Sequence, residues 1–335
     1  MARAGLGAAL LLATGVAGCA GPTARSAETP PTGCGPVTAE VESMDVTPLD
    51  PTPRPALPVT VPSADGVTST VTDASRILPV NLYGSIAEIV FSLGLGGSVV
   101  GRDTSTTFAA AAHLPVVTPA GHDLSAEAIL ALEPTVVLAD DSIGPPEVLD
   151  QLRAAGIPVV LIADEQTLAA VPEHIRAIAG ALGVAIAGEE LVRRVDAEIE
   201  AARRQPGSGP PPRVAFLYLR GTAGVYLMGG DGAGSDAMIE AIGAVDAGSA
   251  IGLRRFRPLT SEGLINAAPD IILVMSEGLA SVGGVDGLLA LPGVAQTPAG
   301  ANRRIVDMAD GVLLTFGTRT GSAVRALARA VYECR

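Results

Sequence analysis

A repeated stretch constrains the fold of this chain more than any other feature. Residues 124–138 read LSAEAILALEPTVVL and residues 259–273 read LTSEGLINAAPDIIL, and the two align without a gap. Each copy predicts a short helix with a Ser or Thr cap, a proline that ends it, and a buried apolar strand. Glu127 and Glu262 occupy the same place in the first helical turn. The repeat therefore predicts two lobes of similar build, and only the first copy follows a histidine, His122.

Strand and helix patterns alternate on both sides of one long helical segment. Strands are expected at 77–80, 99–102, 136–139, 159–162, 214–219, 225–228, 271–275 and 305–308, and helices at 85–93, 125–132 and 146–155. Such alternation favours parallel sheets covered by helices. A further helix at about 187–204 has one apolar stripe and ends before the Pro- and Gly-rich run 207–212. We predict two Rossmann-like α/β lobes, residues 73–183 and 207–335, joined by a single helix within 184–206.

Residues 1–18 have the features of a signal peptide. Arg3 precedes an apolar run at 6–16 that is shorter than the roughly 20 residues of a membrane-spanning helix. The sequence Val16-Ala17-Gly18-Cys19 resembles the lipobox of bacterial lipoproteins, in which Cys19 is acylated; an ordinary cleaved signal peptide is the alternative. Two acyl chains anchor a protein stably. We therefore expect an extracytoplasmic protein held on the cell membrane by lipid, with a Pro- and Thr-rich tether over residues 19–72.

The other two cysteines lie near the ends of the mature chain. With Cys19 used for lipid, Cys34 and Cys334 remain outside the membrane, where disulfides persist. A bond between them would join the N-terminal segment to the last helix. Two free thiols are the alternative, and we favour the disulfide because oxidation prevails in that compartment.

Charge and motifs exclude several classes of function. The formal net charge of −13, with no basic cluster, argues against nucleic-acid binding. The run MGGDGAGSDA at 228–237 is superficially similar to a dinucleotide fingerprint, which leaves a nucleotide-dependent enzyme as a distant alternative. An exported protein has no ready nicotinamide pool, and the chain contains no GxSxG, HExxH or CxxC motif. We predict a protein that is not an enzyme.

The chain from about residue 76 onward resembles the solute-binding lipoproteins of bacterial ABC importers. The resemblance is to the class whose lobes are joined by one rigid helix, known as class III. Residues 76–108, RILPVNLYGSIAEIVFSLGLGGSVVGRDTSTTF, are similar to the haem-carrying branch of that class. The resemblance implies a monomer that binds haem between its lobes and delivers it to a membrane permease. A siderophore or corrinoid carrier of the same class is the alternative.

The same resemblance implies a ligand set for the haem iron. In one branch of the haem carriers, iron lies between a histidine of one lobe and a tyrosine of the other, with an arginine two residues after the tyrosine; His122, Tyr218 and Arg220 match this arrangement. Ferric iron accepts imidazole and phenolate ligands. Residues i and i+2 of a strand share a face, so Arg220 can stabilise a phenolate at Tyr218 or pair with a haem propionate. Met275, at the end of a strand, is expected to line the pocket or to pack in the core.

The two repeated glutamates are assigned a different role by the resemblance. In this class, one glutamate of each lobe docks onto arginines of the permease, and Glu127 and Glu262 hold the matching positions. A carboxylate in the first turn of a helix stays exposed and is favoured by the helix dipole. Stabilisation of the helix alone is the alternative explanation.

Overall fold

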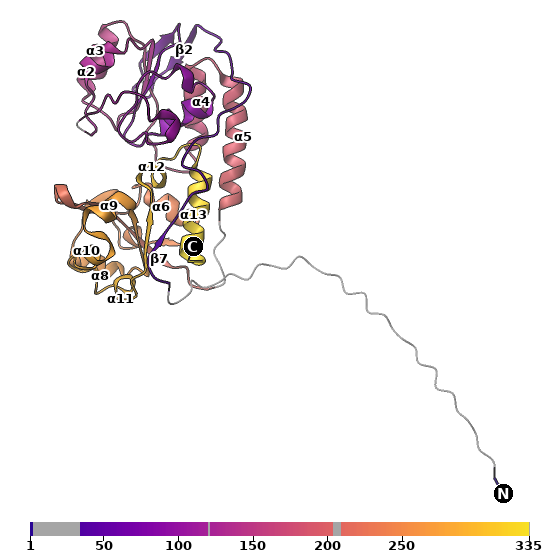
Figure 1. Cartoon of the computed structure of the whole chain (residues 1–335), viewed down its shortest axis with the longest axis vertical. Helices are drawn as coiled ribbons and strands as arrows, with labels where there is room; N and C mark the ends of the chain where they lie inside the picture. The colour runs from indigo at the N-terminus through magenta and orange to yellow at the C-terminus, as the bar shows by residue number, and fades with distance from the viewer. Residues whose placement is uncertain (3–33, 120, 204–208, 335) are drawn as a thin grey trace.

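The structure is a computed structural model that describes residues 1–2, 34–119, 121–203 and 209–334 (Figure 1). The predicted signal peptide, apart from its first two residues, and the predicted lipidation site at Cys19 lie outside the described residues. No helix in the described ranges combines the length and apolar character that crossing a bilayer requires.

The first lobe contains a parallel sheet of three strands, in the order β4-β5-β6. Its elements are β4 (Ile77–Pro79), α1 (Ser85–Ser92), α2 (Ala126–Ala131), β5 (Val136–Ala139), α3 (Pro146–Ala154), β6 (Val159–Leu161) and α4 (Val171–Ala181), with short 3-10 turns at Gly96–Ser98 and Ala109–Ala111. The strand expected at 99–102 forms only isolated bridges, Ile77 with Val99 and Arg102 with Val116. The other strands and helices predicted for this lobe are confirmed.

The second lobe contains a mixed sheet in the order β1-β12-β11-β7-β8-β10, with β9 paired to β7. Its strands are β7 (Arg213–Arg220), β8 (Val225–Gly229), β9 (Val245–Asp246), β10 (Phe256–Pro258), β11 (Ile271–Met275) and β12 (Ile305–Met308). Its helices are α6 (Ser235–Ala241), α7 (Ala247–Ala250), α8 (Ser261–Ala267), α9 (Ser276–Ser281), α10 (Gly284–Leu289), α11 (Pro298–Ala301), α12 (Asp310–Leu313) and α13 (Thr320–Tyr332). The 3-10 turn Gly221–Ala223 and Gly224, at φ 66°, connect β7 to β8 as an antiparallel hairpin.

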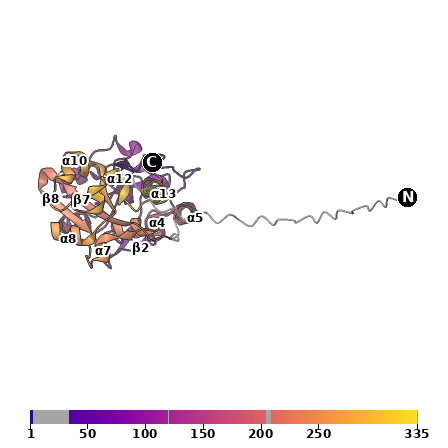
Figure 2. The ribbon, with the colours of Figure 1, turned by 90° about the horizontal axis from the view of Figure 1, so that it is seen from below.

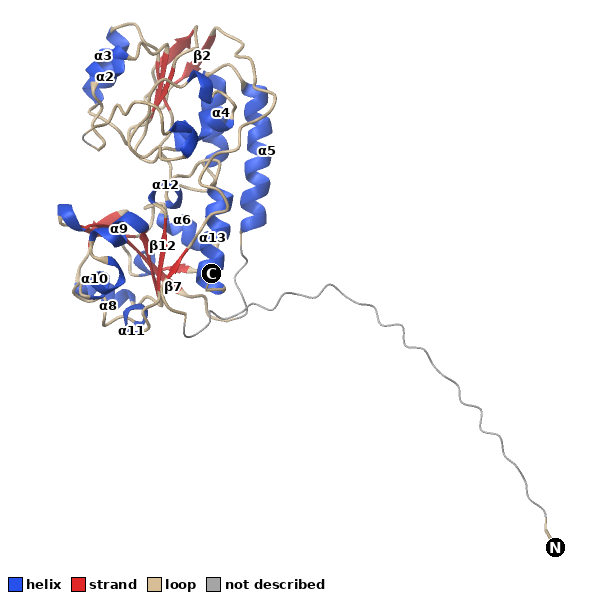
Figure 3. Cartoon of the chain, in the orientation of Figure 1, coloured by secondary structure: helices blue, strands red, loops and turns tan. Residues whose placement is uncertain are grey.

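A single helix, α5 (Ala185–Ala202), connects the lobes, as predicted (Figure 3). Leu191, Val195 and Ile199 form its buried stripe, and it packs against α4 of the first lobe and α13 of the second. Seen from below, β8 and α10 lie on the side of the molecule opposite α5 (Figure 2). The two lobes are therefore hinged along one side.

The first-lobe sheet β4-β5-β6 and the central strands β7, β11 and β12 of the second lobe are buried on both faces. Alternate residues of the strands, such as Ile77 and Phe216, join one central core that continues from lobe to lobe along α4, α5 and α13. The opposite faces form two outer cores, one in each lobe. Continuous apolar strands are the expected consequence of burial on two faces.

The prediction of a tether as far as residue 72 is wrong for residues 34–72. Strand β1 (Val37–Thr38) extends the sheet of the second lobe beside β12, and β2 (Val59–Pro62) pairs with β3 (Thr68–Val71) on the first lobe. Their few apolar side chains, including Val71 at 0% exposure, join the central core. The structure also joins Cys34 to Cys334 in the predicted disulfide, with Cα atoms 5.8 Å apart. The segment crosses from lobe to lobe, although it has the composition of a linker.

Candidate ligand-binding site

The carboxyl ends of the strands in the two lobes meet at the boundary between the lobes. After β12, a Cβ on Gly311 would collide with the hydroxyl of Thr107 in the first lobe. After β4, a Cβ on Gly84 would lie 2.9 Å from the carbonyl oxygen of Ser105 in the same first-lobe loop. Ligands of open α/β sheets bind outside the carboxyl ends of the strands. The lobe boundary is therefore the candidate site.

Strand β7 brings Tyr218 and Arg220 to this boundary. Val214 and Phe216 occupy the same face of β7 within the central core, and the two polar residues continue that face to the end of the strand, where both are half-buried. The Arg220 guanidinium lies 4.6 Å from the centre of the Tyr218 ring. The predicted neighbourhood of these two side chains is present in the structure.

Arg220 is held in place by the second lobe itself. Its Nη2 donates to Oδ2 of Asp310 over 2.9 Å, and its Nη1 donates to the carbonyl oxygen of Leu219 over 2.9 Å. The Asp310 carboxylate also accepts from the backbone N–H of Glu277 over 2.9 Å. The cation is therefore ordered over the tyrosine ring.

Phe256 and Met275 flank Tyr218. The Phe256 ring, on β10, makes an edge-to-face contact with the Tyr218 ring at 5.9 Å between centroids. Val274 pairs with Leu217 in the ladder between β11 and β7, so Met275 follows as the neighbour of Tyr218. Met275 is 5% exposed and belongs to the central core, so in this conformation core packing accounts for most of its surface.

His122 lies on the other lobe, in the loop that leads into α2. It is exposed, and its carbonyl oxygen accepts from the N–H of Gly144 at 3.5 Å. Asp123 forms an isolated bridge with Gly144, which ties this loop to the segment after β5. Across the described residues, no hydrogen bond joins the imidazole of His122 to Tyr218. The structure thus brings Tyr218 and Arg220 together and leaves His122 on a separate, accessible loop.

Tyr83 is a further polar residue on the first-lobe side of the boundary. This residue follows β4 and packs half-buried against the central core. Burial raises the pKa of the Tyr83 phenol, and the charges of Asp140 and Asp164 raise it further, whereas Arg255 of the second lobe lowers it. Tyr83 directly follows a parallel strand, at the edge where ligands of open α/β sheets bind.

A buried polar network supports the first-lobe side of the boundary. The backbone N–H of Asn81 donates to Asp103 over 3.0 Å, and its side-chain amide donates to Asp140 over 2.9 Å. Burial raises the pKa of each carboxyl to about 6, although hydrogen bonds from Asn81, Thr106 and Ser142 oppose the change. This network fixes the loops that follow β4 and β5.

Glu127 and Glu262 occupy equivalent exposed positions on the outside of the lobes. Ser125 caps α2 by accepting from the N–H of Ala128 over 3.3 Å, and Thr260 caps α8 by accepting from the N–H of Gly263 over 3.1 Å. Each glutamate lies in the first turn that follows its cap, as predicted. Helices α2 and α8 both lie on the side of the molecule away from α5 (Figure 1).

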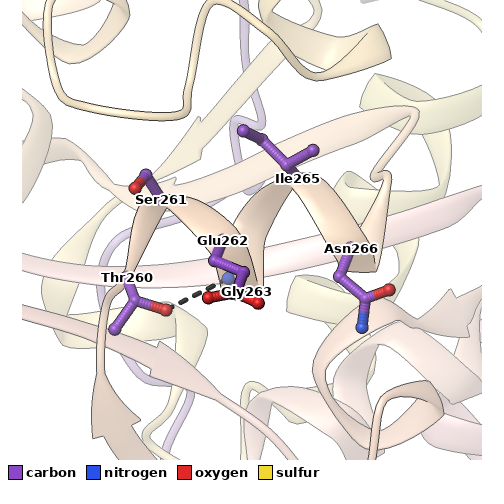
Figure 4. Close-up of a pocket in the computed structure, with 6 residues that line it drawn as sticks. All are labelled: Thr260, Ser261, Glu262, Gly263, Ile265 and Asn266. Atoms are coloured by element: carbon purple, nitrogen blue, oxygen red, sulfur yellow. Dashed lines mark hydrogen bonds between the residues drawn. The ribbon is translucent and has the colours of Figure 1, made fainter.

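An open depression surrounds Glu262 (Figure 4). All of its lining residues belong to α8 or its cap: Thr260, Ser261, Glu262, Gly263, Ile265 and Asn266. The residues that line this depression do not include Tyr218 or any first-lobe residue. It is therefore distinct from the boundary site and belongs to the surface that carries Glu262.

The glycine-rich run 228–237 does form a loop between a strand, β8, and a helix, α6. A Cβ on Gly234 of this loop would lie 3.1 Å from the Cβ of Gln166 in the first lobe. Close approach of the opposite lobe explains this glycine without a bound nucleotide.

Two α/β lobes joined by one helix, with their strand ends facing each other, define a two-lobed ligand-binding protein. The chain belongs to the periplasmic binding protein family, whose family model matches residues 80–311. This family consists of binding components of transport systems, which agrees with the prediction that the protein is not an enzyme.

Three similar proteins place the chain within the family. It is 25% identical over 280 residues to YvrC of Bacillus subtilis (strain 168), an uncharacterised ABC transporter substrate-binding lipoprotein, covering 82% of this chain and 86% of YvrC. The crystal structure of the heme-binding protein HmuT is 42% identical with a TM-score of 0.85, covering 90% of this chain and 98% of HmuT. The periplasmic heme-binding protein RhuT from Roseiflexus sp. RS-1, in its apo form, is 46% identical with a TM-score of 0.72, covering 78% of this chain and 99% of RhuT.

Solved structures of HmuT also include variants in which a histidine, a tyrosine or an arginine is replaced by alanine. The replaced tyrosine and arginine are two positions apart in that protein. Tyr218 and Arg220 have the same spacing here.

Proposed function

We propose that this protein binds haem between its lobes and delivers it to an ABC importer. The observation that carries the proposal is the Tyr218–Arg220 pair at the carboxyl end of β7, with the guanidinium 4.6 Å from the ring centre. The similarity of this chain to HmuT and RhuT, which are heme-binding proteins, supports haem as the ligand. Similarity to YvrC supports the importer as the partner.

Tyr218 and His122 are the proposed iron ligands, one from each lobe. An unperturbed tyrosine titrates near pH 10, so a phenolate ligand needs stabilisation from the metal and from a cation. Arg220 supplies that cation, since Asp310 holds it against the ring. A phenolate ligand favours ferric over ferrous haem, which suits a carrier. Met275 is proposed to contact the haem if binding moves it from its core position.

Glu127 and Glu262 are proposed to dock the two lobes onto arginines of the permease. Both are exposed acids in capped first turns, and neither forms an ion pair among the described residues. The distance between the lobes would then set the distance between the two docking charges. A charge pair of fixed spacing gives an interface its orientation.

Cys19 is proposed to carry the lipid that anchors the protein to the extracytoplasmic face of the cell membrane, with the chain acting as a monomer. The lipobox-like sequence before Cys19 supports this placement, and YvrC is named as a lipoprotein. Replacing Cys19 by Ser and assaying the membrane and soluble fractions tests it: the anchored form moves to the soluble fraction.

A spectroscopic titration tests the haem proposal directly. Purified protein is titrated with hemin, and the position and intensity of the Soret band are compared for wild type, His122→Ala, Tyr218→Phe and the control Tyr226→Phe. Tyr226 also lies in a strand of the second lobe, on β8, and pairs with Leu219 rather than with Tyr218. We expect the band to change in the first two variants and to stay unchanged in the control. A wild-type spectrum identical to that of free hemin rejects the proposal.

A further inference from the structure

Arg255 stands out among the arginines near the lobe boundary because its guanidinium has no partner. It is exposed, and within the described part of the chain its side chain makes no hydrogen bond or ion pair. In contrast, Arg220 pairs with Asp310 at 2.9 Å, and Arg319 pairs with Glu88 at 2.6 Å. Arg255 is therefore a cation that the fold itself does not neutralise.

The backbone of Arg255 is fixed in an unusual conformation. Its φ of 52° lies in the left-handed region, which non-glycine residues rarely adopt. Its N–H donates to the carbonyl oxygen of Asp231 over 2.8 Å, and its own carbonyl oxygen accepts from Gly230 over 3.0 Å. Non-glycine residues that their surroundings hold in this conformation cluster at binding sites. The side chain consequently leaves the chain in an enforced direction.

The loop that hydrogen-bonds the backbone of Arg255, residues 230–234, faces the first lobe. A Cβ added at Gly234 of this loop would lie 3.1 Å from the Cβ of Gln166. Two acids, Asp164 and Asp141, lie near this contact; burial and the Asp164 charge raise the pKa of Asp141, and Arg255 opposes that change. Arg255 is thus within electrostatic reach of Asp141 without forming an ion pair with it.

Arg255 is also adjacent to the residues proposed to bind haem. The next residue, Phe256, makes the edge-to-face contact with Tyr218 at 5.9 Å. On the opposite lobe, the charge of Arg255 reaches the phenol of Tyr83. The unpaired guanidinium therefore belongs to the residue that directly precedes Phe256, the ring in contact with the proposed iron ligand.

We infer that Arg255 binds a carboxylate of the ligand, which is a haem propionate if the proposed function holds. Guanidinium groups match carboxylates through two parallel N–H···O bonds. Arg220 is already bound to Asp310 and to a backbone carbonyl, so it has less capacity for this role. Asp141 and Asp164 repel a carboxylate on the first-lobe side and direct it toward Arg255. The arginine thus selects porphyrins with free acid groups.

Hemin and hemin dimethyl ester, whose propionates carry no charge, distinguish this role from a structural one. Both are titrated into wild type, Arg255→Asn and Arg254→Ala, and dissociation constants are compared. Asparagine tolerates a positive φ, so Arg255→Asn keeps the backbone conformation. Arg254 is the matched control because it is the preceding residue, 80% exposed and paired with Asp231.

We expect Arg255→Asn to weaken hemin binding roughly tenfold to a hundredfold, to leave the dimethyl ester within about twofold, and to keep the Soret position of wild type. Arg254→Ala should bind both ligands as wild type does. Equal weakening of both ligands, or no weakening of hemin, overturns the inference while leaving haem binding intact. A wild type that binds neither porphyrin instead overturns the proposed function, and the inference with it.

Discussion

Glu88 and Arg319 form a buried ion pair that joins the two lobes. Nη2 of Arg319 lies 2.6 Å from Oε2 of Glu88, and its Nε lies 2.9 Å from the same oxygen. The other carboxylate oxygen of Glu88 accepts from the backbone N–H of Arg319 over 2.7 Å. The two side chains are 1% and 11% exposed. Glu88 belongs to α1 of the first lobe and Arg319 directly precedes α13 of the second, so the pair fixes the lobes at the hinge.

Replacing Arg319 by Ala should lower the free energy of unfolding by about 3–5 kcal/mol, because it leaves the Glu88 carboxylate buried without its cation. Urea unfolding followed by circular dichroism measures the change. Arg325→Ala on the same helix is the control, since its contact with Glu42 is 3.8 Å long and solvent-exposed. The double variant Glu88→Gln, Arg319→Ala should recover part of the loss; no recovery would contradict the assignment of the loss to the uncompensated charge.

Breaking the Cys34–Cys334 disulfide should destabilise the protein by about 2–5 kcal/mol. The bond joins residues 300 positions apart and holds β1 beside β12. Thermal unfolding with and without reductant measures the effect. Cys34→Ser should unfold at the temperature of the reduced wild type and should not respond to reductant. Equal stability of oxidised and reduced protein would show that β1 stays beside β12 without the bond.

Stability should increase as the pH falls from 7 to about 5. Burial raises the pKa of Asp103 and Asp140 to about 6, above the ordinary value of 3.8. The folded state therefore binds more protons than the unfolded state between these values, and the stabilisation present below about pH 4 is lost as the pH rises through 6. The two carboxyls together account for roughly 2–3 kcal/mol between pH 7 and 5.

Urea midpoints at the two pH values check the sign. His174 acts in the opposite direction, because burial lowers its pKa, so the informative quantity is the difference between wild type and Asp140→Asn. The variant should show about half of the increase. An identical pH dependence in the variant would mean that Asp140 does not titrate in this range.

Arg220→Ala should move the acid transition of the hemin complex to higher pH. Without the guanidinium 4.6 Å from its ring centre, Tyr218 loses a cation that favours the phenolate, so the iron ligand is protonated sooner as the pH falls. Absorbance of the Soret band against pH measures the midpoint. Asp310→Asn, which removes the partner of Arg220 but keeps the cation, should give a smaller shift. An unchanged midpoint in Arg220→Ala would show that Arg220 does not stabilise Tyr218 as the iron ligand.

Charge reversal at the docking glutamates should abolish haem uptake by cells without changing haem binding in solution. Glu127→Arg or Glu262→Arg would place like charges against the arginines proposed for the permease. Growth on haem as the iron source and the hemin titration are the two measurements. Glu147→Arg is the control, because Glu147 is also an exposed acid in the first turn of a helix, α3. Equal uptake by Glu127→Arg and the control would exclude docking through Glu127.

Local sequence pattern was sufficient to predict the positions of most helices and strands and part of the candidate site. The apolar runs of β5, β7, β11 and β12, and the amphipathic stripe of α5, give their positions within one or two residues. The relation of Tyr218 to Arg220 follows from the two-residue period of a strand. Sequence pattern did not predict the structure of residues 34–72. There, short strand pairings and a disulfide, rather than a periodic apolar face, hold the chain against the two lobes.

The sequence by itself determined that the protein has two α/β lobes, one connecting helix, and a tyrosine with an arginine beside it, because each of these depends on periodicity within a short segment. Tertiary structure alone decided what lies across the lobe boundary. Glu88 is bonded to Arg319, 231 positions away, and the charge of Arg255 acts on Asp141 of the opposite lobe. Such contacts depend on how the packed lobes place distant loops, and no local pattern of side chains encodes that placement.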